Sequence, residues 1–255
     1  MLWYKSWLDT RWRFLTGLAL LSILACGIVF EYVQVLRILP TVGTPPDASG
    51  LVGRAINEAI ALERTYRGFI WLQWFRQNLM QMGTLFAALL GSGSPLSGSS
   101  GGALFTLSLP ASRTRWLGVR AATGLAEFFV LAVVPSLVIP LLSPVIGQHY
   151  SVVDAVVHST CLFIGGSAFF SLAFLLSTVF GDLWRPLLIA CTAAVMLGLC
   201  EQYLFGLSSY GIFGAISAAT YFRTGALPWP GLLASVAASA AMLYAADRNI
   251  ARQDF

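Results

Sequence analysis

Leu117-Gly-Val-Arg-Ala-Ala-Thr-Gly-Leu-Ala-Glu-Phe-Phe-Val-Leu-Ala-Val-Val-Pro-Ser-Leu-Val-Ile-Pro-Leu-Leu142 is the stretch of sequence that decides the fold class. Only Arg120 and Glu127 carry charge in it. About 20 apolar residues in an α-helix are enough to cross the hydrocarbon core of a bilayer. Strands of a membrane β-barrel alternate polar and apolar residues, and this stretch does not. The sequence therefore predicts a transmembrane helix over residues 117–142.

The composition extends this prediction to the whole chain. Hydrophobic residues make up 57% of the 255 positions, charged residues make up 10%, and the mean hydropathy is +0.77. A soluble domain carries about 25% charged residues, so this chain cannot cover a globule with polar surface. We predict an all-α polytopic membrane protein with a single transmembrane domain of six helices. The predicted spans cover residues 14–32, 69–90, 117–142, 153–178, 186–201 and 228–246.

The segment before the first span, residues 1–13, is predicted to form an interfacial helix. A charged residue recurs at every fourth position, and a pair of tryptophans lies beside this stripe. The charged residues are Lys5, Asp9 and Arg13, and the tryptophans are Trp3 and Trp7. This combination is typical of a helix that lies in the lipid headgroup plane. The alternative is a cleaved signal peptide, but the apolar run that follows is long for one.

Three connecting segments complete the predicted layout. Residues 33–68 form an extracytoplasmic segment in which a Pro-Pro pair breaks any helix and residues 51–66 form an amphipathic helix. Residues 91–116 form a cytoplasmic loop between the second and third spans. Residues 202–227 are rich in glycine and aromatic residues, which favours a re-entrant or interfacial helix before the last span.

Basic residues set the predicted orientation. The net charge is +4, with 15 basic and 11 acidic residues, and the basic residues cluster at the ends of spans. Such residues are topological signals and headgroup anchors, so no nucleic-acid partner is expected. Most of them face the cytoplasm when both termini are cytoplasmic, as the positive-inside rule requires. The residues on that side are Lys5, Arg11, Arg13, Arg113, Arg115, Arg120, Arg185, Arg248 and Arg252.

The sequence lacks the motifs of an enzyme that acts alone. Lys5 is the only lysine, so there is no Walker motif to bind and hydrolyse a nucleotide. His149 and His158 lack the spacing of an intramembrane metalloprotease, and neither a catalytic residue nor a metal site is predicted. The cysteines lie within apolar runs, where thiols behave as small hydrophobic groups, and neither a disulfide nor a cofactor is expected in this chain.

The second predicted span is unusually polar, and the third carries a carboxylate. A charge inside the membrane should face protein or water and find a partner. One interpretation is a polar path or gate for a transported substrate. The other is an ion pair or a snorkelling arginine that docks two helices. The candidate path residues are Arg76, Gln77, Asn78, Gln81 and Glu127.

The loop before the third span reads Leu104-Phe-Thr-Leu-Ser-Leu-Pro-Ala-Ser-Arg113. It resembles the cytoplasmic signature of type-2 ABC-transporter permeases, in which a Thr-Leu-x-Leu-Pro-Val-Ser-Arg stretch precedes the third span. Residues 2–8 are similar to the interfacial helix that opens many such subunits, and residues 251–255 are similar to their ending. Family members usually carry an acidic residue upstream of the signature, where this chain has Ser97-Gly-Ser-Ser-Gly101.

The resemblance implies a permease subunit of an ATP-driven exporter in the bacterial inner membrane. It implies that a separate ATPase subunit, which binds the ATP and Mg²⁺, docks on the loop. It further implies that a second permease copy or paralogue completes a dimer, and that the substrate is hydrophobic or amphipathic. The residues that the resemblance assigns to coupling with the ATPase are Leu104, Phe105, Thr106, Leu107, Leu109, Pro110, Arg113 and Arg115.

The sequence leaves a second class of function open. A non-transporting membrane scaffold that recruits an ATPase to a larger complex would have the same apolar spans. A membrane enzyme is a third interpretation, for which the sequence offers no constellation of nucleophile, base or metal ligands. The identity of the substrate does not follow from the sequence.

Overall fold

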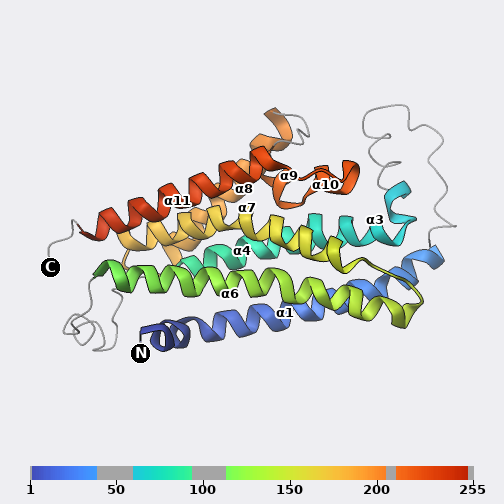
Figure 1. Cartoon of the computed structure of the whole chain (residues 1–255), viewed down its shortest axis with the longest axis horizontal. Coiled ribbons are helices and arrows are strands. Elements are labelled where there is room, and N and C mark those ends of the chain that lie inside the picture. Colours follow the sequence, from blue (N-terminus) through green and yellow to red (C-terminus); the bar gives the residue numbers. More distant parts are fainter. Residues whose placement is uncertain (1, 39–59, 94–112, 205–210, 252–255) are drawn as a thin grey trace.

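The computed structural model describes residues 2–38, 60–93, 113–204 and 211–251, and within these ranges the chain is an all-α helix bundle (Figure 1). Five helices in the described ranges are long and apolar enough to cross a membrane. They are α1 (Leu2–Ile38), α6 (Arg113–Leu142), α7 (Val152–Val179), α8 (Trp184–Leu204) and α11 (Trp229–Ala251). The prediction of a multi-pass, all-α membrane protein is confirmed.

A further pass along the bundle consists of three shorter helices that follow one another without a gap. They are α3 (Tyr66–Ile70), the π-helix η2 (Trp71–Asn78) and α4 (Leu79–Gly91). Together they contain the predicted span 69–90, and they run along the bundle with α4 packed on α7 (Figure 1). The π-helix divides this pass, so no single piece of it has the roughly 20 residues of a span.

The π-helix has a buried aromatic face. Trp71 donates its indole N–H to the carbonyl oxygen of Ser217 at 3.0 Å, and Trp74 donates its own to the hydroxyl of Ser136 at 3.3 Å. Both tryptophans are almost completely buried. A buried indole needs a hydrogen-bond acceptor, and here each one has it. Wide helical turns of this kind are frequent at functional sites.

Two short helices connect α8 to α11. They are α9 (Ile212–Ile216) and α10 (Ala219–Thr224), and α9 packs against both α7 and α11. Ala218, between them, adopts a φ of 49°, which turns the chain from one short helix into the next. These helices lie within the segment predicted to be re-entrant or interfacial.

The start of α1 and the end of α11 lie at the same end of the bundle (Figure 1). We call this the terminal end and the opposite one the distal end. α1 begins and α11 ends at the terminal end, and α4 ends and α6 begins there as well. The segment that connects α4 to α6 is therefore attached to the bundle at the terminal end.

Two predicted boundaries differ from the structure. α1 runs unbroken through residue 14, because neither glycine nor proline interrupts residues 2–16, so residues 1–13 are not a separate helix. α6 begins at Arg113, which places Arg113 and Arg115 in its first turn instead of in the predicted loop 91–116. The predicted amphipathic helix 51–66 lies mostly outside the described residues.

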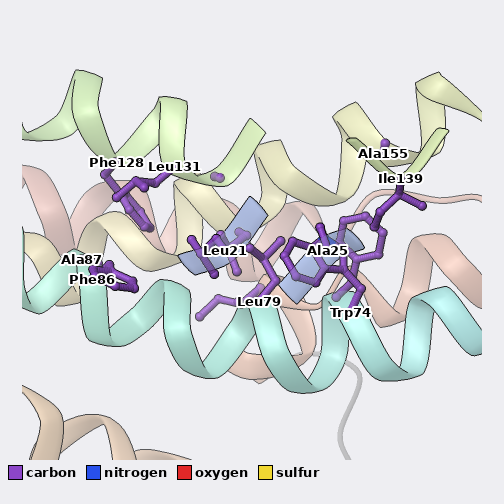
Figure 2. Close-up of a cluster of buried hydrophobic side chains, with 14 of the residues drawn as sticks. Leu21, Ala25, Trp74, Leu79, Phe86, Ala87, Phe128, Leu131, Ile139 and Ala155 are labelled. Carbon is purple, nitrogen blue, oxygen red and sulfur yellow. The ribbon is translucent and has the colours of Figure 1, made fainter. Parts of the chain in front are cut away.

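The largest apolar cluster among the described residues is built from most of the long helices (Figure 2). Its enclosed side chains include Leu21, Ala25, Trp74, Leu79, Phe128, Leu131, Ile139 and Ala155. Glycines allow the helices around it to approach closely, as is common in membrane proteins. At Gly124 and Gly166, an added Cβ would lie 2.7 Å and 2.6 Å from a phenylalanine ring. These two glycines therefore serve helix packing.

Candidate functional site

A pocket of about 780 Å³ opens on one side of the bundle, between η2, α4, α8 and the two short helices. Its volume lies within the range of small-molecule sites, about 300–1,000 Å³. Two arginines, Arg76 and Arg223, and the carboxylate of Glu201 line it. Most of the remaining lining is apolar, including Leu85 and Val195. The pocket is therefore suited to a molecule with both charged and apolar parts.

The structure does not gather all the candidate path residues in one place. Arg76 and Gln81 line the pocket. Gln77 is exposed, and the side-chain amide of Asn78 turns back to donate a hydrogen bond to the carbonyl of Gln73, at 2.8 Å. The carboxylate predicted for the same path, Glu127, is on α6 and does not line this pocket.

Aromatic rings hold Arg76 at the edge of the pocket. The guanidinium carbon of Arg76 lies 5.5 Å from the centre of the Trp71 ring. Trp71 stacks on Phe222 of α10, with ring centres 4.4 Å apart and planes 11° from parallel. The guanidinium of Arg67 lies 5.4 Å from the centre of the Phe222 ring. Cation–π contacts thus connect two arginines through a pair of stacked rings.

Glu201 has a structural partner within the pocket wall. Its carboxylate oxygens accept hydrogen bonds from the backbone N–H groups of Phe213, at 3.0 Å, and Gly214, at 3.3 Å. These N–H groups belong to the first turn of α9 and have no partner within the helix. An added Cβ at Gly211 would overlap the carboxylate, so only glycine allows this approach. Glu201 therefore connects α8 to the amino end of α9.

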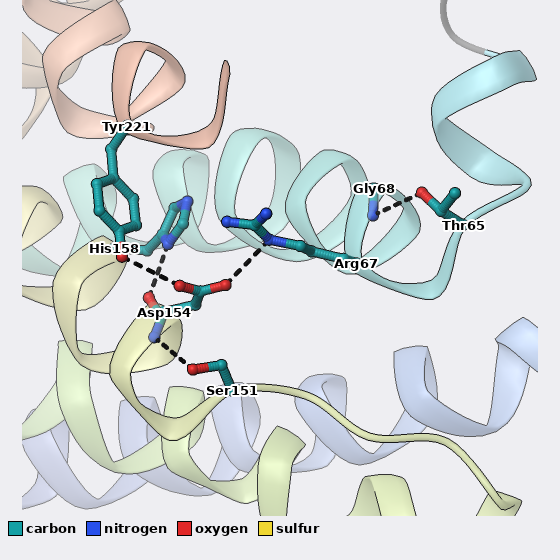
Figure 3. Close-up of polar contacts among 7 residues, drawn as sticks. All are labelled: Thr65, Arg67, Gly68, Ser151, Asp154, His158 and Tyr221. Carbon is teal, nitrogen blue, oxygen red and sulfur yellow. Dashed lines mark hydrogen bonds and ion pairs between the residues drawn. The ribbon is translucent and has the colours of Figure 1, made fainter. Parts of the chain in front are cut away.

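A second polar cluster lies at the distal end around Asp154, in the first turn of α7 (Figure 3). One carboxylate oxygen forms an ion pair with Nε of Arg67 from α3, at 3.0 Å. The other accepts a hydrogen bond from the hydroxyl of Tyr221 in α10, at 3.1 Å. The backbone N–H of Asp154 donates to the hydroxyl of Ser151, which caps α7. Asp154 therefore ties α3, α7 and α10 together.

Two buried polar groups border this cluster. The carbonyl of Asp154 accepts a hydrogen bond from Nδ1 of His158 at 2.7 Å, which assigns a proton to that nitrogen. Nε2 of His158 and the hydroxyl of Tyr150 are buried without a hydrogen-bond partner among the described residues. Burial raises the pKa of the Tyr150 hydroxyl, and the Asp154 carboxylate raises it further, so Tyr150 keeps its proton.

Glu127 has its partner at the terminal end. It is 5% exposed, and its Oε1 accepts a hydrogen bond from the hydroxyl of Thr10 in α1, at 2.6 Å. Its other carboxylate oxygen is buried without a hydrogen-bond partner among the described residues. The buried carboxylate thus joins α6 to α1, and Arg76 is not its partner.

Two arginines converge on the carboxyl end of α4. Arg13 of α1 donates a hydrogen bond to the carbonyl of Ser92 at 3.0 Å. A guanidinium nitrogen of Arg120 lies 3.3 Å from the position that a Cβ of Gly93 would occupy. Cations are favourable at a helix carboxyl terminus, where carbonyl groups lack partners. We call Arg13, Ser92, Gly93 and Arg120 the arginine joint, because these residues connect α1, α4 and α6.

Most residues assigned to coupling with an ATPase lie outside the described residues. These are Leu104, Phe105, Thr106, Leu107, Leu109 and Pro110. Arg113 begins α6, and Arg115 is exposed in its first turn. The segment that contains the signature therefore ends directly at α6.

Asp154 is a site residue that was not predicted, although the sequence around it carries a signal. Ser151-Val-Val-Asp154 precedes an apolar run, and this Ser-x-x-Asp spacing is typical of a helix amino terminus. That pattern indicates the cap but not the ion pair, because Arg67 is distant in sequence. The role of Glu201 as the cap of α9 could not be predicted from its position at the end of a span.

No known protein family, curated protein or solved structure matches this chain. A functional assignment therefore rests on the signature in the sequence and on the geometry of the bundle.

Proposed function

We propose that this chain is the membrane-spanning permease subunit of an ATP-driven transporter. In this proposal a separate ATPase subunit binds ATP and Mg²⁺ and docks on the segment that contains residues 101–115. Two permease subunits, identical or paralogous, form the transport unit in a bacterial plasma membrane. The chain itself does not hydrolyse ATP, and its cargo is hydrophobic or amphipathic.

The arginine joint is the observation that carries the proposal. The signature segment follows α4 and precedes α6, and Arg13 bonds the carboxyl end of α4 to α1. Arg120 approaches the same point from α6. A force applied to the segment would therefore reach three helices, α1, α4 and α6, at once. This is the arrangement that a permease without its own ATPase needs.

The distribution of basic residues supports a cytoplasmic terminal end. α1 and α6 begin there with Lys5, Arg11, Arg13 and Arg115, and α11 has Arg248 in its last turn. The positive-inside rule favours the cytoplasm for such an end. This orientation requires the run of α3, η2 and α4 to cross the membrane, which gives six passes and places the signature segment within reach of a cytoplasmic ATPase.

The test is reconstitution with candidate ATPase subunits. We expect a stable complex with one ATPase per permease chain, and ATPase activity in lipid that cargo stimulates. A double substitution, F105A with R113Q, should lower the stimulated activity by about tenfold, within the usual range of coupling free energies. The matched control is R185Q, which changes an exposed arginine paired with Asp182 and should leave the stimulation unchanged.

Two results would contradict the proposal. Stimulation that is undiminished in the F105A/R113Q variant would remove the coupling role of the segment. Failure to retain any ATPase would favour a scaffold that belongs to a larger complex. Co-purification with a larger complex, without cargo-stimulated ATPase activity, would identify the scaffold.

A further inference from the structure

We infer that the pocket between η2, α4, α8, α9 and α10 binds an anionic amphiphile, with Arg76 contacting the acidic headgroup and α4 and α8 enclosing the alkyl chain. That this amphiphile is transported rests on the proposed function. The binding itself does not, because it follows from the charges and the lining of the pocket.

The contrast between the two arginines of the aromatic stack indicates an anion. Arg67 has a counter-ion, since its Nε lies 3.0 Å from the carboxylate of Asp154. Arg76 makes no ion pair with any residue that the structure describes, and it lines the pocket instead. An arginine within a membrane-embedded bundle requires a partner. An acidic ligand in the pocket would supply to Arg76 what Asp154 supplies to Arg67.

Arg76 is held in position for this contact. One side of its guanidinium is occupied by Trp71, which is 1% exposed and is itself fixed by its hydrogen bond to Ser217. The planar guanidinium presents its N–H groups at its edge, where a carboxylate or phosphate binds in two-pronged fashion. The carboxylate of Glu201 in the same wall is already bonded to two backbone N–H groups. Arg76 is thus oriented before any ligand arrives.

The lining changes from charged to apolar along the pocket. Arg76 lies about 13 Å before Leu85 along the helix, at roughly 1.5 Å per residue. The far part is lined mainly by Met80, Leu85 and Val195, with Cys191 and the polar side chains of Gln81 and Thr84 beside them. The charged part includes Arg223 of α10. Helix α10 lies in the half of the bundle away from the terminal end (Figure 1). A headgroup near the membrane surface with a chain directed toward the middle of the bilayer fits this order.

The chain contains its own probe for occupancy. Cys191 lines the pocket, and Cys200 is an exposed thiol on the same helix that does not line it. We would treat the purified protein, in a neutral maltoside detergent and without any ATPase, with N-ethylmaleimide. Labelling of each cysteine would be followed by peptide mass spectrometry. Tetradecyl phosphate is expected to slow the labelling of Cys191 at least about tenfold at saturation while leaving Cys200 unchanged, because an occupied pocket excludes the reagent.

Substitution then identifies the anion contact. R76Q should weaken protection by tetradecyl phosphate about tenfold or more, as the loss of a charge-assisted hydrogen bond predicts. R185Q, which is outside the pocket, should behave as the unmodified chain does. Each variant is first checked for an unchanged elution volume and melting temperature. Loss of the fold would slow or accelerate labelling of both cysteines, so the ratio between them remains interpretable.

Four outcomes would overturn the inference. Equal protection by tetradecyltrimethylammonium would show that charge is not recognised, and equal protection by inorganic phosphate would show that the alkyl chain is not. Undiminished protection of Cys191 in R76Q would show that Arg76 does not contact the headgroup and that the amphiphile shields the cysteine non-specifically. Spontaneous cross-linking of V195C between two chains, with no protection by any amphiphile, would identify the pocket as an interface with a second copy. The proposed function is untouched by these results, because no ATPase takes part.

Discussion

Asp154 joins three helices at the distal end. Its side chain is only 14% exposed, and it holds Arg67 of α3 and Tyr221 of α10 at the start of α7 (Figure 3). A carboxylate with few water contacts gains more from such partners than an exposed one does. Removal of the charge therefore leaves Arg67 and Tyr221 without the group that joins them.

We predict that D154N lowers the stability of the purified protein by about 1–2 kcal/mol, since a hydrogen-bonded charge is lost while the size of the side chain is kept. In a protein of this length, this corresponds to a decrease of roughly 2–8 °C in the melting temperature. The measurement is thermal unfolding in detergent. D182N is the control, because the Asp182–Arg185 pair is exposed at both partners and should contribute almost nothing. Equal effects of the two substitutions would disprove the role assigned to Asp154.

For a single charged residue inside a span, the sequence predicts that a partner exists but does not identify that partner. Glu127 interrupts an apolar run, so a buried partner was expected for it. That partner is the Thr10 hydroxyl, 117 positions away in the chain. The hydroxyl of a threonine in an amphipathic first helix gives no local sign of this role. Arg76 similarly carried a visible charge, whereas its contact with Trp71 depends on the widened turn of η2.

Helices α4 and α7 approach each other closely at Gly91. Gly91, in the last turn of α4, lies against the main chain of α7, and a Cβ there would overlap the carbonyl oxygen of Phe170. The backbone carbonyl of Phe170 cannot move out of the way of an added Cβ as the end of a flexible side chain could. The α4–α7 contact therefore depends on the absence of a side chain at position 91.

We predict that G91A destabilises the protein by about 1–3 kcal/mol, the usual cost of overpacking, as α4 and α7 are forced apart. G118A is the matched control, because no atom lies within 4 Å of a Cβ at that position of α6. Alanine favours a helix over glycine by up to about 1 kcal/mol, so G118A should be neutral or stabilising. Thermal unfolding of both variants in the same detergent decides the matter. A G91A protein as stable as G118A would contradict the close approach.

Elements were predictable from the sequence in proportion to their length and apolarity. The runs around residues 14–32 and 153–178 lie inside α1 and α7, because few polar residues obscure them. The pass through residues 66–91 was recognised as apolar, but its division by a π-helix was not. The alternative hydrogen-bond pattern of η2 depends on where Trp71 and Trp74 find acceptors, on α6 and near α9. Those acceptors are tertiary contacts, which periodicity does not reveal.

At the scale of the whole molecule, the number of crossings determines which surfaces can meet a soluble partner. Among the described residues, five single helices are long and apolar enough to cross the membrane: α1, α6, α7, α8 and α11. If α3, η2 and α4 also cross together, residues 39–59 and residues 94–112 face opposite sides of the membrane. If they do not cross, both segments face the same side. The proposed docking of an ATPase on the signature segment requires the first arrangement.

The most direct measurement is therefore the sidedness of two serines, one in each segment. S49C and S99C, each introduced into a chain without other cysteines, would be treated with a membrane-impermeant maleimide in intact cells and in inverted membrane vesicles. We predict labelling of S49C only from outside and of S99C only from the cytoplasmic face. Labelling of both from the same side would contradict the six-pass arrangement and, with it, the proposed coupling of this bundle to a cytoplasmic ATPase.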